Sequence, residues 1–231
     1  MSVPTDQVSG PTLLAQIPLR GMRRTIARRM TESLQSSAQL TLHTICGAAG
    51  LFSTFGAMKE LQPLGSISLN DLLLFAVART LPEHPALNAT LEDDVISRWT
   101  SVNLGFAVAL EDGLIVPVIR ECQERELHDL ASAAHGLAEK SRTGALTMTD
   151  VTDGTFTVTN LGGFGIDHFT PIINPPQVGI LGIGRATPQG LPLSLTIDHR
   201  ALDGVVGARF LSGLSETIGA MHLAAERVEW S

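Results

Sequence analysis

Residues 198–204 read DHRALDG, and they stand where an apolar run gives way to a helical pattern. The run before them, residues 193–198, has the length and apolar content of a buried strand, whereas residues 204–221 repeat apolar side chains at helical spacing. The histidine of this segment, His199, is therefore expected at an edge of a sheet, where a pocket can reach it. Its near-neutral pKa suits the removal of a proton from a hydroxyl or thiol. The same residues are equally compatible with a histidine that only satisfies a turn between Asp198 and Arg200.

Outward from this segment, the chain alternates between helical and extended patterns. Helices are predicted at residues 21–37, 48–61, 68–82 and 127–140, the first because Met22, Ile26, Met30 and Leu34 fall four apart on one face. Strands are predicted at residues 103–110 and 114–119, which form a hairpin, and at residues 155–160 and 178–184. The order lacks the regular spacing of a doubly wound sheet. We therefore predict an α/β (α+β) fold, in which helices cover a mixed sheet.

Composition limits the class of protein further. The chain has 231 residues, 44% of them hydrophobic, and a net charge of −7, which allows one substantial core and argues against a general nucleic-acid binder. The longest apolar run is far too short to cross a bilayer, and the amino terminus does not resemble a secretory signal, so we expect a cytoplasmic protein. Cys46 and Cys122 are far apart in apolar surroundings, which argues against a disulfide scaffold or a thiolate zinc site.

Common catalytic motifs are missing from the sequence. There is no phosphate-binding loop and no nucleophile elbow, and Gly182 and Gly184 make only an isolated G-x-G. His128 and His135 are seven residues apart, about 10 Å along a helix, so they cannot share a metal ion. No metal site is predicted. The arginines of the first helix could meet an anionic ligand, but they also fit the solvated face of that helix.

Four ordered blocks of the sequence resemble one family. DHRALDG resembles the DHRxxDG signature of the acyltransferase component of 2-oxoacid dehydrogenase complexes, and its shorter form, HxxxDG, is shared with chloramphenicol acetyltransferases. The other blocks are IPLRGMRRTIARRMTES (17–33), VNLGFAVALEDGLIVPVI (102–119) and GTFTVTNLGGFGIDHFTPIINPPQVGILGIGR (154–185). The resemblance extends from about residue 17 to residue 214. It implies a chloramphenicol acetyltransferase-like fold and a homotrimer with active sites at the subunit interfaces.

The resemblance also implies a mechanism. His199 would be the general base that takes a proton from the acceptor, which then attacks the thioester of acetyl-CoA. Thr159 occupies the position where the family has a serine hydroxyl that stabilises the oxyanion. Asp203 would hold the His199 loop in place, with an arginine of the first helix as one route, and would not shuttle protons. Acetyl-CoA would be a co-substrate; no bound cofactor is needed, and the coenzyme-binding residues are not identified.

Several features depart from the family pattern. Residues 1–16 are expected to form a flexible arm and residues 17–231 a single catalytic domain, with no lipoyl or subunit-binding domain. Neither Lys59 nor Lys140 fits a lipoyl attachment site. Ala38 and Gln39 stand where family members often have Pro-His, near the acceptor pocket. The charged segment 225–231 replaces an apolar tail, so we expect a trimer that does not assemble further.

These departures favour one function over two others. We expect a free-standing enzyme that moves acetyl from acetyl-CoA to a small hydroxyl metabolite, the primary alcohol of a tetronate natural-product intermediate. The alternative is the dihydrolipoamide acyltransferase core of a 2-oxoacid dehydrogenase complex. A non-catalytic scaffold is disfavoured, because it would have no reason to keep His199, Asp203 and the hydroxyl of Thr159. The acceptor and the acyl chain length stay open.

Overall fold

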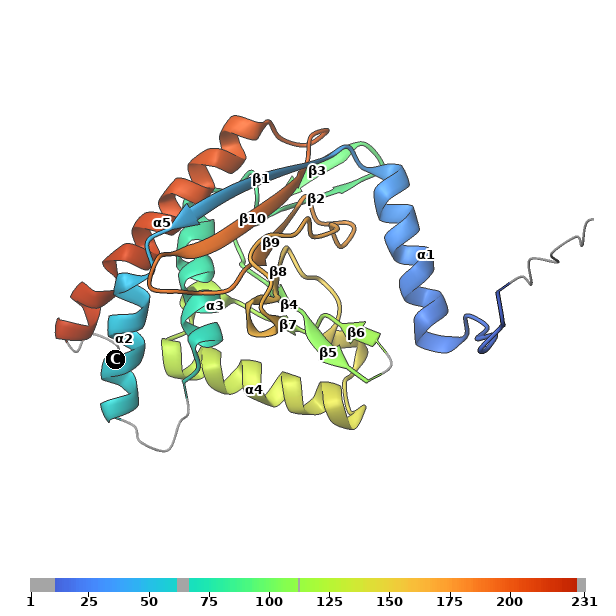
Figure 1. The fold of residues 1–231 in the computed structure, drawn as a ribbon. Helices are drawn as coiled ribbons and strands as arrows, with labels where there is room; N and C mark the ends of the chain where they lie inside the picture. Colours follow the sequence, from blue (N-terminus) through green and yellow to red (C-terminus); the bar gives the residue numbers. More distant parts are fainter. Residues whose placement is uncertain (1–10, 62–66, 112, 228–231) are drawn as a thin grey trace, which may run out of the picture.

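The computed structural model describes residues 11–61, 67–111 and 113–227 (Figure 1). The longer helices are α1 (Gly21–Ser36), α2 (Ala49–Leu61), α3 (Leu69–Thr80), α4 (Leu127–Thr143) and α5 (Gly204–Arg227). The short 3-10 helices are η1 (Leu81–Glu83), η2 (Cys122–Glu124), η3 (Met148–Asp150) and η4 (Gly162–Phe164). The strands are β1 (Gln39–Cys46), β2 (Ala89–Glu92), β3 (Val95–Arg98), β4 (Leu104–Phe106), β5 (Val108–Leu110), β6 (Gly113–Ile115), β7 (Val118–Ile119), β8 (Phe156–Asn160), β9 (Gly179–Ile183) and β10 (Leu191–Asp198).

The central sheet has six strands in the order β1-β10-β9-β8-β4-β7. β8 runs parallel to both of its neighbours, β9 and β4, whereas the other pairs are antiparallel. The sheet is therefore mixed and helices cover it, as the sequence predicts. Two further two-stranded sheets, β2-β3 and β5-β6, lie outside it.

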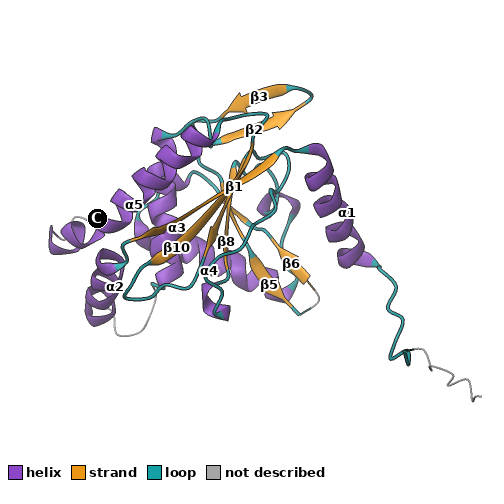
Figure 2. Cartoon of the chain, turned by 45° about the horizontal axis from the view of Figure 1, so that its top comes forward, coloured by secondary structure: helices purple, strands orange, loops and turns teal. Residues whose placement is uncertain are grey.

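The two faces of the central sheet differ in character. On β10, Leu193, Leu195 and Ile197 are fully buried in the main apolar core, which also includes residues of α3 and α5. Successive side chains of a strand point to opposite faces, so Ser194 and Thr196 lie on the other face. Figure 2 shows α2, α3 and α5 on one side of the sheet and α1 on the other. Two residues of the segment 165–178 contact this polar face: Phe169 packs on Gly182, and Gln177 accepts a hydrogen bond from Thr157.

The sequence explains the start of α3, and the burial of α3 differs from that of α1. α3 begins with a capping box: the Ser68 hydroxyl accepts from the N–H of Asp71 at 3.2 Å, and the Asp71 carboxylate accepts from the N–H of Ser68 at 2.7 Å. α3 is buried over most of its length. By contrast, Met22 and Leu34 of α1 are 45% and 55% exposed, so the apolar face of α1 is only partly covered within one chain.

The structure contains two elements that the sequence pattern left unassigned. β1 is an edge strand whose side chains are mostly half-buried, and it pairs with β10 from Gln39 opposite Asp198 onwards. β2 and β3 form a hairpin whose turn residues, Asp93 and Asp94, both have positive φ. The predicted hairpin at 103–119 also divides: β5 and β6 pair with each other, while β4 and β7 join the central sheet.

Some expectations concern residues beyond the described part of the chain. Residues 1–10 of the expected arm lie outside the described residues, and residues 11–20 form neither helix nor strand. Residues 228–231 of the charged tail also lie outside, so the expectation about further assembly stays a prediction. Across the described ranges, none of the helices combines the length and the apolar character needed to span a membrane.

Candidate active site

Hydrogen bonds to the carboxylate of Asp198, the last residue of β10, hold the DHRALDG turn in place. Asp198 is buried and accepts from Arg200, through Nη2 at 2.6 Å and the main-chain N–H at 3.1 Å, and from the N–H of Ala38 at 3.2 Å. Burial alone would raise the pKa of the Asp198 carboxyl, but the hydrogen bonds from Arg200 and Ala38 outweigh it and hold the pKa below its ordinary value. The next N–H, that of His199, donates to the carbonyl of Ala38 at 2.8 Å. The backbone of the histidine is thus fixed to the start of β1.

The imidazole of His199 projects beyond this fixed backbone. Its side chain is 46% exposed, and its Nδ1 lies 3.7 Å from Oδ1 of Asp203. That separation is too long for a hydrogen bond. Asp203 stands just before α5, where its carbonyl accepts from the N–H of Val206 at 3.0 Å. This contact with His199 is an ion pair only when the imidazole is protonated.

Thr159 lies on the polar face of β8 and lines a mainly apolar cavity of about 220 Å³. Thr157, two residues earlier on the same face, also lines this cavity, but its hydroxyl donates to Oε1 of Gln177 at 2.6 Å. The described residues give the Thr159 hydroxyl no such partner. Thr159 is therefore the hydroxyl at this cavity that is free to donate to a ligand.

His199 and Thr159 lie at opposite ends of the sheet within one chain. Thr159 is paired with Gly182 of β9, and Gly182 is paired with Ser194 of β10. His199 is five residues beyond Ser194, which is about 17 Å along the strand, and two strand spacings add roughly 10 Å across it. One chain therefore cannot bring the imidazole and the Thr159 hydroxyl to the same small ligand.

A second cavity, of about 400 Å³, is lined by residues of α3 and α4, on the helix-covered side of the sheet. Ala107 borders both cavities, and Asn160, next to Thr159, donates to the side chain of Asn70 in the second cavity at 3.0 Å. The polar groups of this second cavity include Ser68, Asp71, His135 and Arg142.

Comparison with protein-family models identifies the family of the chain. The model of the 2-oxoacid dehydrogenases acyltransferase catalytic domain matches residues 13–225. The chain belongs to this family. It is 42% identical over 217 residues to the dihydrolipoyllysine-residue acetyltransferase component of the acetoin cleaving system of Bacillus subtilis, covering 86% of this chain and 54% of that protein. This acyltransferase chain thus spans about half the length of the curated relatives it matches.

Solved structures agree with the family. The dihydrolipoamide acetyltransferase of Azotobacter vinelandii superposes with a TM-score of 0.85 at 30% identity, over 91% of this chain and 93% of that one. The cubic core of a pyruvate dehydrogenase multienzyme complex gives a TM-score of 0.86 at 30% identity, over 96% and 98% of the two chains. A chloramphenicol acetyltransferase, at 14% identity and a TM-score of 0.51, shares the fold alone. The predicted fold class is confirmed.

These relatives overturn the function favoured by the sequence. We expected acetylation of a tetronate alcohol, but the similar curated proteins are dihydrolipoyllysine-residue acetyltransferase components of acetoin and pyruvate dehydrogenase systems. The expectation was wrong because it gave weight to departures such as Ala38 and Gln39. In the acyltransferase fold these residues keep structural contacts: Ala38 holds the His199 turn, and Gln39 donates to the hydroxyls of Ser33 and Ser37 at 3.0 and 2.9 Å.

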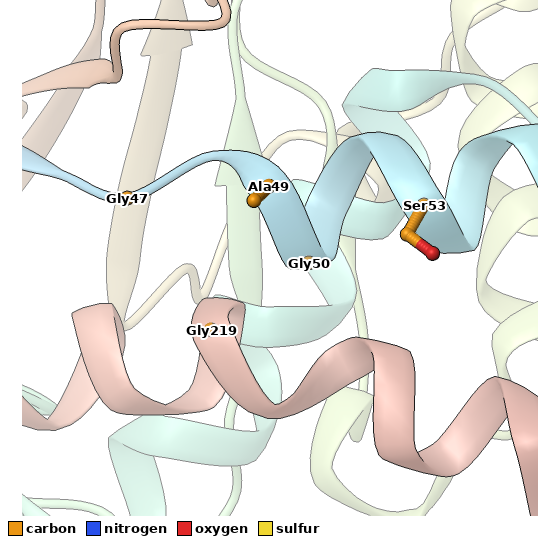
Figure 3. A pocket seen from close by; sticks show the side chains of 5 residues that line it. All are labelled: Gly47, Ala49, Gly50, Ser53 and Gly219. Carbon is orange, nitrogen blue, oxygen red and sulfur yellow. The ribbon is translucent and has the colours of Figure 1, made fainter.

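The described part of the acyltransferase has further pockets and titratable groups away from Thr159. A pocket of about 370 Å³ between α2 and α5 is lined by glycines, Ala49 and Ser53 (Figure 3). In the described part of the chain, no three His, Cys, Asp or Glu side chains are grouped so that they could hold a metal ion. The carboxylate of Asp71 accepts a hydrogen bond from Nε2 of His135 at 2.9 Å. Burial raises the pKa of the Cys46 and Cys122 thiols to about 11, which keeps both protonated near neutral pH.

Proposed function

We propose that this chain is the catalytic core of a dihydrolipoyl acyltransferase, which moves an acyl group between coenzyme A and a dihydrolipoyl thiol. The observation that carries the proposal is the 42% identity to the acetyltransferase component of the acetoin cleaving system, across nearly the whole catalytic domain. The residue pattern agrees. The Azotobacter structure was studied for a catalytic serine, a histidine and an asparagine four residues after it. Here Asp203 follows His199 by four residues, and Thr159 supplies the hydroxyl.

The reaction follows from these groups. His199 removes the proton from the attacking thiol, and the resulting sulfur nucleophile attacks the carbonyl carbon of the acyl thioester. The tetrahedral oxyanion accepts a hydrogen bond from the Thr159 hydroxyl, which is not engaged elsewhere. When the intermediate collapses, the bond to the departing sulfur breaks and His199 returns the proton to it. Asp203 stands 3.7 Å from Nδ1 of the ring and helps to hold the His199 turn in place.

A complete site then needs two chains. The register of the sheet separates His199 from Thr159 within one chain, so the imidazole of one copy must meet the hydroxyl of the next. The surface supports self-association, because Leu14 and Ile17 are 100% and 88% exposed and precede the half-covered α1. Identical copies joined head to tail close into a ring. A homotrimer with one site at each interface satisfies this arrangement.

The second cavity is suited to the coenzyme. It shares Ala107 with the Thr159 cavity, but residues of α3 and α4 line it, on the helix-covered side of the sheet. The carrier of a thioester at Thr159 would have to pass Ala107 to reach it. Arg142 can pair with a phosphate, and the hydroxyl and amide groups of Ser68 and Asn70 can meet the polar pantetheine chain. The apolar Thr159 cavity would then hold the reacting thioester and the acceptor thiol.

The test is acyl transfer by the purified 231-residue chain. Release of CoA from acetyl-CoA is measured with dihydrolipoamide as the acceptor, and S-acetyldihydrolipoamide is identified as the product. We expect turnover that is lost in His199→Ala, with the oligomer and its thermal unfolding unchanged. An unmodified chain that forms no acetylated dihydrolipoamide, or a His199→Ala variant that stays active, would contradict the proposal.

A further inference from the structure

The ring of Phe169 lies directly on Gly182, in the strand position beside Thr159. A Cβ added at Gly182 would stand 2.8 Å from Cζ of Phe169 and 3.2 Å from both of its Cε atoms. Gly182 is the β9 residue paired with Thr159 of β8. The missing side chain at residue 182 is therefore what lets an aromatic ring occupy the place next to the free hydroxyl.

The segment that carries Phe169 is fastened to β9 and its continuation. Asp167 accepts two hydrogen bonds from Arg185, from Nε at 3.0 Å and from Nη2 at 3.1 Å, and the N–H of Arg185 donates to the carbonyl of Ile166 at 2.8 Å. Gly184 allows the closest approach, since a Cβ there would lie 1.9 Å from the carbonyl oxygen of Asp167. These contacts hold the main chain at residues 166 and 167, which precede Phe169, against β9 and its continuation.

We propose that Phe169 determines acyl-chain specificity, and that Gly182 sets the position of its ring. The inference rests on the proposed function. If the thioester oxygen accepts from the Thr159 hydroxyl, the acyl chain begins within one strand spacing, about 4.8 Å, of the Phe169 ring. Only one or two carbons fit before the chain meets the ring edge. The structure thus points to acetyl and propionyl thioesters as substrates, and longer or branched acyl groups are excluded.

The other apolar walls of the cavity come from three further elements. Met30 of α1, Leu114 of β6 and Ile180 of β9 line the cavity together with Phe169, and Leu114 is 43% exposed. Ile180 is buried and sits in a strand, and Leu114 belongs to the β5-β6 hairpin. Phe169 comes from a segment without regular structure and has the largest side chain of the wall, so it is the residue whose replacement enlarges the cavity most.

Three variants test the inference through a ratio, not through activity alone. The measured quantity is kcat/KM for butyryl-CoA divided by kcat/KM for acetyl-CoA, with dihydrolipoamide as the acceptor. Phe169→Ala is expected to raise this ratio by about 10–200-fold, the range that one or two methylene groups can supply in an apolar pocket. Gly182→Ala is expected to change the ratio, because the new methyl group would stand 2.8 Å from Cζ of Phe169 and must displace the ring. In the double variant the ratio should return to that of Phe169→Ala alone, since no ring remains to be pushed.

A matched control is available in Phe164→Ala, a change of the same kind on a side chain that is 73% exposed and does not line the cavity. Its ratio should equal that of the unmodified chain. An unchanged ratio in Phe169→Ala, while acetyl transfer persists, would overturn the role of Phe169. A Gly182→Ala effect that persists at full size in the double variant would overturn the positioning role of Gly182. If the unmodified chain transfers no acyl group at all, the proposed function fails and the inference fails with it.

Discussion

The main-chain N–H of Ala38 donates to the carboxylate of Asp198 at 3.2 Å, across 160 positions of sequence. In return, the carbonyl of Ala38 accepts the N–H of His199 at 2.8 Å. Both main-chain groups of Ala38, just before β1, are therefore hydrogen-bonded to the end of β10. The position of His199, the proposed general base, depends on the pairing of an edge strand with its neighbour.

Replacing Asp198 by Asn tests this connection. The amide has nearly the same shape but no charge, so Arg200 loses its ion pair and the hydrogen bonds to residue 198 weaken. We expect Asp198→Asn to lower the free energy of unfolding by about 1–3 kcal/mol, together with a fall in kcat because the His199 backbone is less well fixed. Urea unfolding measures the first effect. Glu32→Gln is a suitable control, since it removes only the exposed Arg28–Glu32 pair and should cost less than about 1 kcal/mol.

Acid should remove the contribution of Asp198. Because the folded protein holds the pKa of this carboxyl below its ordinary value, the charged form stabilises the fold above the unfolded pKa of about 3.9. That stabilisation is lost as the pH falls through the lower, folded value. The difference in unfolding free energy between the unmodified chain and Asp198→Asn should therefore be constant near pH 7 and shrink below about pH 4. A difference that grows on acidification would contradict the assignment.

The Thr159 hydroxyl is expected to act on the transition state. Thr159→Val keeps the shape of the side chain but removes the donor, so kcat should fall by about 10²–10³-fold with little change in KM. Thr159→Ser keeps the donor and should retain most of the activity. Thr157→Val is the matched comparison on the same strand face: its hydroxyl is committed to Gln177, so its loss should affect kcat less than tenfold, a limit of about 1.4 kcal/mol. Equal losses at Thr157 and Thr159 would contradict the distinction.

Arg142 is expected to act on the coenzyme alone. If its guanidinium pairs with a phosphate, Arg142→Ala should raise KM for acetyl-CoA by about tenfold, which is roughly 1.4 kcal/mol, and leave kcat unchanged. S-acetyl-N-acetylcysteamine, a thioester without phosphates, should be used equally well by the variant and the unmodified chain. Arg28→Ala, at an exposed arginine outside the cavity, is the control. A parallel loss with both thioesters would show that Arg142 does not read the phosphates.

The sequence predicted those parts of the fold that depend on local pattern. The strand before His199 and the helix after it could be read from residues 193–221, and the capping box at Ser68 from its spacing to Asp71. β1 was not found, because an edge strand with half-buried Leu40 and Leu42 gives little alternation in burial. The Asp93–Asp94 turn was a usable signal for the β2-β3 hairpin.

The candidate site also has parts that the sequence predicted and parts that only the structure shows. His199, Asp203 and Thr159 were assigned through the family resemblance, and those assignments stay predictions. Two contacts depend on which strands become neighbours, and no local sequence pattern indicates that. They are the hydrogen bond between Ala38 and Asp198 and the packing of Phe169 on Gly182. For the same reason, the distance between His199 and Thr159 could not be predicted from local sequence patterns. Register alone places them at opposite ends of the sheet.

Because His199 and Thr159 are far apart in one chain, we predict that two inactive variants can complement each other. A site built within a single chain would not allow this. His199→Ala and Thr159→Val should each be almost inactive alone, but co-expression should restore activity in mixed oligomers. A site works when the chain that supplies histidine is the threonine variant and the chain that supplies threonine is the histidine variant. Random assembly of equal amounts gives this combination at about one quarter of the interfaces.

The mixed oligomers are isolated through a different affinity tag on each variant, and CoA release with dihydrolipoamide is measured. Co-expression of His199→Ala with the double variant carrying both changes should stay inactive, because no chain then provides an imidazole. Mixing the two single variants after purification should restore activity only as fast as subunits exchange. If the doubly tagged oligomers of the two single variants remain inactive, the shared site is contradicted. A site built within one chain would carry one of the two substitutions in every copy and would therefore stay inactive.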